Sequence, residues 1–223
     1  MPHHAVATAE QAVEIDAGRV TLSGDLHVAP EATGLVIFAH GSGSSRRSPR
    51  NLVVADMLQA AGLGTLLFDL LTPNEAVIDD RTRTLRFDIP LLATRLTAVV
   101  DWAARHQLVA DRPIGCFGAS TGAAAALVAA AERPALVRAV VSRGGRPDLA
   151  GAALARVQAP TLLLVGGDDA DVIMLNQQAA RQMSGTVQLQ IVPGATHLFE
   201  EPGALAQVAT HASRWFQQYL TTP

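Results

Sequence analysis

The sequence predicts an α/β domain in which helices cover both faces of a mostly parallel β-sheet. The chain has 223 residues, of which 49% are hydrophobic and 17% are charged, as is typical of a compact folded domain. Short apolar runs alternate along the chain with longer helical stretches, the order expected for a parallel sheet connected by helices. We therefore expect residues 1–223 to form a single domain.

The first half of the chain is expected to begin at a sheet edge. Residues 13–15 and 19–28 suit an antiparallel pair, because the second run alternates apolar and polar residues. Residues 34–39 and 64–69 suit buried strands. Ser48 and Pro49 suit the start of a helix that ends near Gly62, because serine caps helices and proline needs no hydrogen bond in the first turn. The polar stretch 72–86 is predicted to be a long loop before a helix at 88–106.

The second half repeats the alternation. Strands are expected at 113–118, 139–142, 160–166 and 187–192, and helices at 148–157, 172–183 and 203–220. The alanine-rich stretch 121–132 has high helix propensity and should end at Arg133 and Pro134. After residue 142 the chain runs directly into a short helix and leaves no room for an inserted lid. We therefore expect no large cap domain and a fairly open site.

Composition argues against several classes of function. The formal net charge is −3 and the basic residues are scattered, so nucleic acid is not an expected partner. Cys116 is the only cysteine, which excludes an intramolecular disulfide and a cysteine-based metal cluster. The first residues lack the pattern of a signal peptide, and no segment has about 18 uninterrupted apolar residues. We expect a cytoplasmic protein with no metal, cofactor or membrane partner.

The motif that carries chemistry is Gly118-Ala119-Ser120-Thr121-Gly122. Gly-x-Ser-x-Gly would arise by chance about 0.06 times in a chain of this composition, so its context matters. It stands between an apolar run and a helix, as the nucleophile elbow requires, and both glycines suit a tight turn where a side chain would clash. The alternative, that Ser120 only caps the helix, leaves the glycines unexplained.

A serine nucleophile needs a histidine base, and the histidine needs a carboxylate to orient it. His197 follows the last expected strand and is our choice of base, whereas His40 is assigned a structural hydrogen bond beneath the neighbouring loop. Asp169 is the preferred carboxylate because it lies far enough past its strand to reach the histidine. Asp168 remains an alternative, and Asp171 is expected to cap the next helix.

Acyl transfer also needs hydrogen-bond donors for the oxyanion of the tetrahedral intermediate. We assign the backbone N–H groups of Thr121 and Ser42 to this role. A phosphate-binding loop is the alternative for the Gly/Ser-rich segment around Ser42, but the Gly-Lys-Ser/Thr element of a P-loop is missing. Arg143 follows a strand at the same edge, where it could hold an anionic group of a substrate or form a surface ion pair.

The chain resembles the dienelactone hydrolase-related branch of the α/β-hydrolases over nearly its whole length. More narrowly, the stretches His40-Gly41-Ser42-Gly43-Ser44-Ser45, Ser48-Pro49-Arg50-Asn51, Phe68-Asp69-Leu70-Leu71-Thr72 and Arg86-Phe87-Asp88-Ile89-Pro90 are similar to hydrolase domains sometimes fused to phosphoribosyltransferases. The resemblance implies an uncapped α/β-hydrolase fold with about eight strands, the triad Ser120, Asp169 and His197, and hydrolysis of small carboxylic esters. Dienelactone hydrolases proper use a cysteine nucleophile, whereas this elbow carries Ser120, so dienelactone itself becomes a doubtful substrate.

The expected function is that of a serine-dependent carboxylic ester hydrolase that acts through an acyl-enzyme and prefers short-chain esters. Two alternatives stay open. The same triad could transfer the acyl group to an alcohol or amine, or the chain could be a non-catalytic relative used for binding, although such a protein would not need an intact triad. The expected partners are a small-molecule ester substrate and, as an open alternative, a second copy of the chain in a homodimer.

Overall fold

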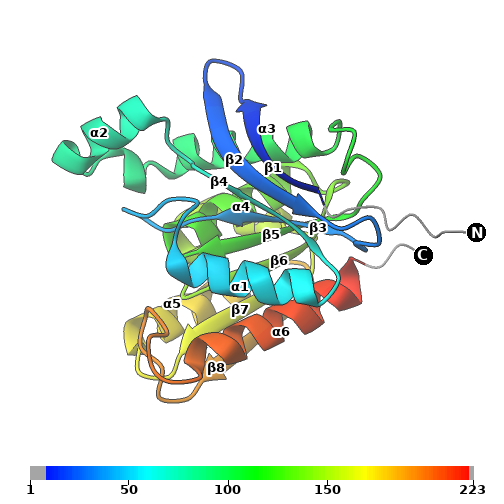
Figure 1. Ribbon diagram of the computed structural model, residues 1–223. Helices are drawn as coiled ribbons and strands as arrows, with labels where there is room; N and C mark the ends of the chain where they lie inside the picture. Colours follow the sequence, from blue (N-terminus) through cyan, green and yellow to red (C-terminus); the bar gives the residue numbers. More distant parts are fainter. Residues whose placement is uncertain (1–8, 221–223) are drawn as a thin grey trace, which may run out of the picture.

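A computed structural model describes residues 9–220 and contains an eight-stranded sheet in the order β1-β2-β4-β3-β5-β6-β7-β8. Strands β1 and β2 pair antiparallel, β2 also pairs antiparallel with β4, and all remaining neighbours are parallel. This confirms the predicted mostly parallel sheet with an antiparallel edge (Figure 1). The strands are β1 (Ala9–Asp16), β2 (Thr21–Val28), β3 (Leu35–Ala39), β4 (Gly64–Phe68), β5 (Ile114–Ala119), β6 (Val137–Arg143), β7 (Thr161–Gly166) and β8 (Val187–Val192).

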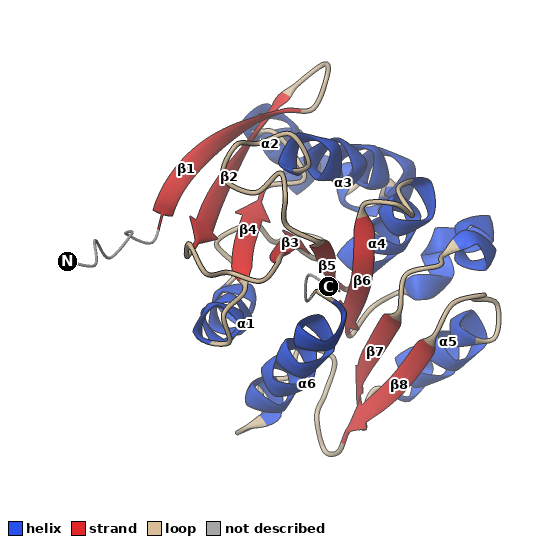
Figure 2. Cartoon of the chain, turned by 90° about the vertical axis from the view of Figure 1, so that its right-hand side faces the viewer, coloured by secondary structure: helices blue, strands red, loops and turns tan. Residues whose placement is uncertain are grey.

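Helices cover both faces of the sheet, as expected. Figure 2 shows α1 and α6 on one side and α3, α4 and α5 on the other. The helices are α1 (Pro49–Ala60), α2 (Pro73–Thr82), α3 (Ile89–Ala103), α4 (Thr121–Glu132), α5 (Ala170–Ala180) and α6 (Ala204–Tyr219), with 3₁₀ segments η1 (Leu85–Phe87) and η2 (Pro147–Arg156).

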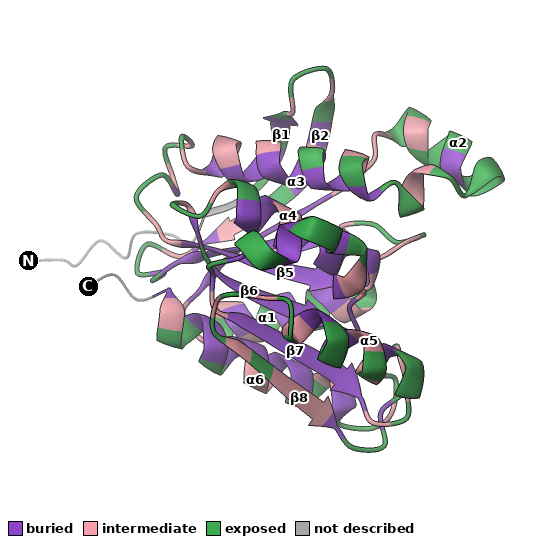
Figure 3. Cartoon of the chain, turned by 180° about the vertical axis from the view of Figure 1, so that it is seen from behind, coloured by how far each residue is buried: buried purple, intermediate pink, exposed green. Residues whose placement is uncertain are grey.

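The central strands are buried on both faces (Figure 3). Because side chains alternate along a strand, β3 supplies both halves of the core. Ile37 packs in the cluster shared with α3 and α4, while Val36 and Phe38 pack in the cluster shared with α1 and α6. This sandwich fixes the carboxyl ends of the parallel strands, where open α/β folds bind their ligands.

The predicted long loop at 72–86 is wrong, because most of this stretch forms α2 and η1. Most residues of α2 are polar, and Asp79 is its only buried residue. The helix therefore lacks the regularly spaced apolar residues by which a helix is recognised in a sequence. A capping box starts the helix instead: the Thr72 hydroxyl accepts from the Glu75 N–H, and the Glu75 carboxylate accepts from the Thr72 N–H. Figure 1 shows α2 projecting from the body of the domain.

Two smaller expectations also change. The segment expected as a helix at 148–157 is the 3₁₀ segment η2, which is interrupted where Gly151 has a φ of 53°. Asp171 does not cap the next helix, since α5 begins at Ala170 and places Asp171 in its first turn. Helix α1 does begin as expected, with the Ser48 hydroxyl accepting from the Asn51 N–H at 3.5 Å.

Candidate active site

The Gly118–Gly122 elbow joins β5 to α4 through a strained turn. Ser120 has a φ of 50°, a left-handed value that is uncommon for a residue with a side chain. A Cβ on Gly118 would lie 2.4 Å from the Ala123 Cα, and a Cβ on Gly122 would lie 2.3 Å from the Ala39 carbonyl oxygen. Both glycines are therefore required by close backbone approach, to the helix in one case and to β3 in the other.

The side chain of Ser120 does not cap α4. Ser120 occupies the N-cap position by its place in the chain, but its hydroxyl makes no capping hydrogen bond. The backbone holds the residue instead: its N–H donates to the Arg143 carbonyl oxygen at 3.2 Å, and its carbonyl accepts from the Arg146 N–H at 3.1 Å. The hydroxyl is left available, which the capping interpretation did not predict.

His197 and Asp169 are joined by a hydrogen bond of 2.7 Å between Nδ1 of the imidazole and Oδ2 of the carboxylate. Asp169 follows β7, and His197 lies in the loop after β8, so the two side chains meet from neighbouring strands. Asp168, the alternative acid, is exposed, and its backbone N–H donates to the Ala195 carbonyl oxygen. This geometry favours Asp169 as the partner of the histidine.

The loop that carries His197 is built around tight contacts. Phe199 is buried at a φ of 57°, and its N–H donates to the Thr196 carbonyl oxygen. Gly144, at a φ of 50°, allows close approach from below, because a Cβ there would lie 2.9 Å from the His197 carbonyl oxygen. These contacts place the imidazole next to Gly144, the residue that follows β6.

His40 has the structural role predicted for it. Its Nε2 accepts from the Leu70 N–H at 3.1 Å, so Nδ1 carries the hydrogen and donates to the Gly41 carbonyl oxygen at 3.0 Å. Burial lowers the pKa of His40, although the bond to Gly41 and the charge of Asp69 oppose that shift. A neutral imidazole thus ties β3 to the segment after β4.

The two proposed oxyanion donors lie on either side of Ser120, the proposed nucleophile. Thr121 is the first residue of α4, where the N–H groups have no partner within the helix. Ser42 lies in the loop after β3, and the neighbouring Gly41 brings that loop against the elbow, because a Cβ there would lie 3.2 Å from the Ser120 Cβ. Within residues 9–220, the Ser42 N–H donates to no protein acceptor. The two N–H groups are therefore the candidate oxyanion donors.

A cavity of about 160 Å³ has Ser42, Ser120, His197 and Arg143, but not Thr121, among its lining residues. A second cavity, of about 590 Å³, lies along the same loop and is also lined by Ser42, Thr121 and residues of α2. The smaller cavity therefore holds the proposed nucleophile and the proposed base. The larger one has the volume of a typical ligand pocket.

Arg143 is not in a surface ion pair, which was one of its two expected roles. The residue is buried, and within the described residues its guanidinium contacts no carboxylate; Nη2 donates to the Asn51 Oδ1 at 3.3 Å and Nε has no partner. Burial, with a smaller contribution from the charge of Arg50, lowers the pKa of Arg143 to about 10. A buried cation without a counter-ion is costly, so the site favours an anion.

Sequence reasoning did not assign Arg50, which lines the same small cavity. It forms a partly exposed ion pair of 3.0 Å with Glu200, and its Nε is buried without a partner. The sequence did contain a clue to its position. Arg50 lies in the first turn of the helix that begins after Ser48, close to the edge of the sheet where the site is expected. The cavity therefore has two arginines at its wall.

Between residues 9 and 220, no group of three or more His, Cys, Asp or Glu side chains could hold a metal ion. No helix in that part of the chain is long and apolar enough to cross a membrane.

Comparison with known proteins gives a family and close structural relatives. The model of the dienelactone hydrolase family matches residues 33–222. The crystal structure of a dienelactone hydrolase from Anabaena variabilis is 59% identical, with a TM-score of 0.94, and the match covers 96% of this chain and 99% of that one. Est1E from Butyrivibrio proteoclasticus is 19% identical over 93% of this chain and 98% of its own, with a TM-score of 0.76, and shows the fold alone.

A curated relative from Mycobacterium tuberculosis, named "Putative phosphoribosyl transferase", is 56% identical over 214 residues. The match covers 96% of this chain but only 47% of that protein, so the chain spans about half the length of the curated relatives it matches. Together these comparisons confirm the α/β-hydrolase fold expected from the sequence.

Proposed function

Because the chain belongs to the dienelactone hydrolase family, we propose that it is a serine hydrolase of small carboxylic esters that acts through an acyl-enzyme. The observation that carries the proposal is the 2.7 Å hydrogen bond between His197 Nδ1 and Asp169 Oδ2, beside the cavity that His197 shares with Ser120. A serine hydroxyl is a weak nucleophile, and an oriented imidazole is the usual group that activates it.

The reaction follows from the position of each proton. Asp169 accepts the Nδ1–H of His197, which leaves Nε2 unprotonated and able to take the proton of the Ser120 hydroxyl as Oγ attacks the ester carbonyl. The N–H groups of Thr121 and Ser42 stabilise the oxyanion. The imidazolium then protonates the leaving alcohol. Water attacks the acyl-enzyme in the same way and restores the free hydroxyl.

The preferred substrates are small esters with an anionic group near the scissile bond. The cavity at Ser120 has a volume of only about 160 Å³, which suits a short acyl or alcohol group. Arg143 supplies a buried positive charge with no acidic partner in the described residues. A carboxylate of the substrate would provide the missing counter-ion and accept charge-assisted hydrogen bonds from the guanidinium.

Labelling with a fluorophosphonate, followed by mapping of the modified peptide, tests the nucleophile. We expect modification of Ser120 in the folded protein and its loss in Ser120→Ala. Ser142→Ala is the matched control, because Ser142 is a buried serine on the neighbouring strand and should not alter the labelled site. If folded wild-type protein stays unlabelled while a control serine hydrolase reacts, the proposal is wrong.

Chain-length preference provides a second test. Turnover of p-nitrophenyl acetate and butyrate should exceed that of the laurate and palmitate esters. Equal or faster turnover of the long-chain esters would contradict the proposed small-ester specificity without affecting the assignment of the nucleophile.

A further inference from the structure

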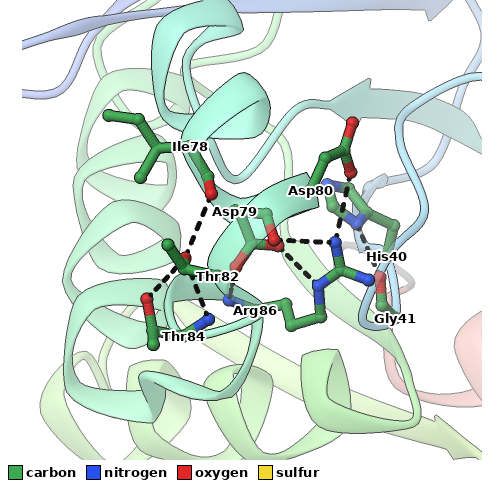
Figure 4. Close-up of polar contacts among 8 residues, drawn as sticks. All are labelled: His40, Gly41, Ile78, Asp79, Asp80, Thr82, Thr84 and Arg86. Atoms are coloured by element: carbon green, nitrogen blue, oxygen red, sulfur yellow. Dashed lines mark hydrogen bonds and ion pairs between the residues drawn. The ribbon is translucent and has the colours of Figure 1, made fainter.

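Arg86 lies outside the groups that take part in the proposed reaction, yet it contacts the loop that carries one of them. A Cβ built on Gly43 would lie only 2.7 Å from Nη1 of Arg86 and 3.5 Å from its Cζ. The guanidinium therefore packs against the backbone immediately after Ser42. Figure 4 shows this side chain extended between Asp79 and Asp80.

Asp79 fixes the direction of Arg86. Oδ2 of Asp79 accepts from Nε of Arg86 at 2.6 Å, and Oδ1 accepts from the Arg86 backbone N–H at 3.0 Å. Nη2 of Arg86 also donates to the Asp79 carbonyl oxygen and to the Asp80 carboxylate, each at 3.2 Å. Burial by itself raises the pKa of Asp79, but the hydrogen bonds and the charge of Arg86 outweigh it and lower the pKa. The pair is thus an ionised carboxylate and a guanidinium held in one orientation.

The element that carries Asp79 is anchored at its other end as well. The Glu75 carboxylate, which belongs to the capping box of α2, accepts from Nη2 of the buried Arg95 on α3 at 2.8 Å. Helix α2 is therefore attached to the body of the domain before it reaches Asp79. Because Asp79 holds Arg86, the guanidinium that lies against Gly43 is fixed relative to the body of the domain.

The loop itself has few internal hydrogen bonds around Ser42. The Ser44 N–H donates to the Gly41 carbonyl at 3.2 Å, and the next fixed point is the bond of 2.8 Å from the Arg46 N–H to the Asp69 carboxylate. Gly43 has a φ of 68°, and glycine moves easily between backbone conformations. A rigid group against Gly43 would restrict that freedom.

On this basis, and resting on the proposed esterase function, we propose that Arg86 is a positioning residue that holds the loop through Gly43, so that the Ser42 N–H points at the oxyanion. The N–H must lie within about 3 Å of the developing charge to stabilise it. A displacement of the order of 1 Å costs about a hundredfold in rate. Because the oxyanion forms only as the reaction proceeds, loss of this positioning should lower kcat rather than weaken substrate binding.

Arg86→Met tests the proposal, because methionine keeps an unbranched apolar stem and removes the guanidinium. We expect kcat for a small neutral ester to fall about 10- to 100-fold while KM changes less than about threefold. The fluorophosphonate should show the same split, with a slower reaction step and similar initial binding. Arg133→Met is the matched control, because Arg133 forms a two-bond pair with Asp101 on α3, at 2.7 and 2.8 Å, away from the loop.

Arg86→Met leaves Asp79 buried without its partner and can impair folding. The double variant Asp79→Asn/Arg86→Met removes both charges and should show the same loss of kcat. Arg86→Lys should recover only part of it, since an ammonium can pair with Asp79 but cannot lie as a plane against Gly43. A merely structural role would lower the melting temperature in these variants and leave kcat of the folded protein unchanged, which would overturn the proposal.

A double-mutant cycle between Gly43→Ala and Arg86→Met provides an independent test. In the wild-type background, the new methyl group would displace the guanidinium and lower kcat. In the Arg86→Met background, the same change should reduce kcat by a smaller factor, because the group it displaced is gone. The left-handed φ strains alanine equally in both backgrounds. If Gly43→Ala lowers kcat by the same factor in both backgrounds, the two residues are not coupled and the proposal is overturned.

These outcomes are separable from failure of the proposed function. Absence of Ser120 labelling in wild-type protein would refute the serine hydrolase assignment. Normal labelling of wild-type protein with unchanged kcat in the folded Arg86 variants would refute only the role of Arg86.

Discussion

The backbone N–H of Ser120 donates a hydrogen bond of 3.2 Å to the carbonyl oxygen of Arg143, so the proposed nucleophile and the buried cation are joined across neighbouring strands. Both residues line one cavity of about 160 Å³. A substrate that reacts at Ser120 would therefore lie within reach of the guanidinium. The proposed nucleophile and the proposed anion-binding residue thus lie at the ends of the neighbouring strands β5 and β6.

Arg143→Met should lower kcat/KM for an ester with a free carboxylate about 10- to 100-fold more than for its neutral methyl ester analogue, since charge-assisted hydrogen bonds contribute about 1.5–3 kcal/mol. Paired assays of the two esters with wild-type and variant protein measure the effect. The neutral ester is the internal control for damage to the fold. An equal loss on both esters would show that Arg143 does not select an anion.

Asp169→Asn should lower kcat by about 10³- to 10⁴-fold, because the amide cannot stabilise the imidazolium and favours the wrong tautomer of His197. Asp168→Asn is the matched control and should change kcat less than about threefold, since Asp168 is exposed. Steady-state kinetics of the two variants on one short-chain ester compares them. A greater loss in the Asp168 variant would transfer the carboxylate role to that residue.

Gly122→Ala should destabilise the fold by more than about 2 kcal/mol, because its methyl group would lie 2.3 Å from the Ala39 carbonyl oxygen and the backbone must move. Gly62→Ala is a control for backbone conformation alone: Gly62 has a φ of 83° and open space around it, so we expect a loss of about 1–2 kcal/mol. Urea unfolding followed by circular dichroism measures both. Equal destabilisation would mean that the close approach at Gly122 relaxes easily.

His40 should make stability depend on pH below neutrality. Its pKa is lowered in the folded protein, so between that pKa and 6.5 the unfolded chain binds more protons, and the free energy of unfolding rises with pH. Stability from this residue is present above about pH 6.5 and is lost as the pH falls through that window. Urea unfolding at pH 7.5 and 5.5 should show a smaller difference for His40→Gln than for wild-type protein. An unchanged difference would assign the dependence to other groups.

Local chemistry explains why the elbow could be predicted. The requirements at Gly118, Ser120 and Gly122 arise within five residues, so their pattern is visible in the sequence. The Asp169 assignment was weaker because Asp168 is its neighbour, and only the direction of each side chain separates them. The position of His197 was predicted from strand order, which the parallel sheet preserves.

The helix between β4 and α3 could not be predicted from the sequence pattern. Helix α2 lacks an apolar face, and it is held by pairs that join distant residues, such as Glu75 with Arg95. One local signal was present: Thr72-Pro73-Asn74-Glu75 has the Thr-x-x-Glu spacing of a capping box with proline in the first turn. Arg86 and its contact with Gly43 could not be predicted, because the contact depends on how a polar helix projects from the sheet.

At Ser120, the side chain needed for the proposed activity lowers the stability of the fold, because the backbone is in a left-handed conformation. A side chain in that conformation costs of the order of 1–2 kcal/mol, and glycine would adopt it without that cost. Ser120→Gly should therefore give a protein that melts at a higher temperature than the wild type and hydrolyses no ester. A screen that selected only for thermal stability would therefore favour loss of the proposed nucleophile. Stabilising this protein for use would accordingly require changes elsewhere in the sheet and helices.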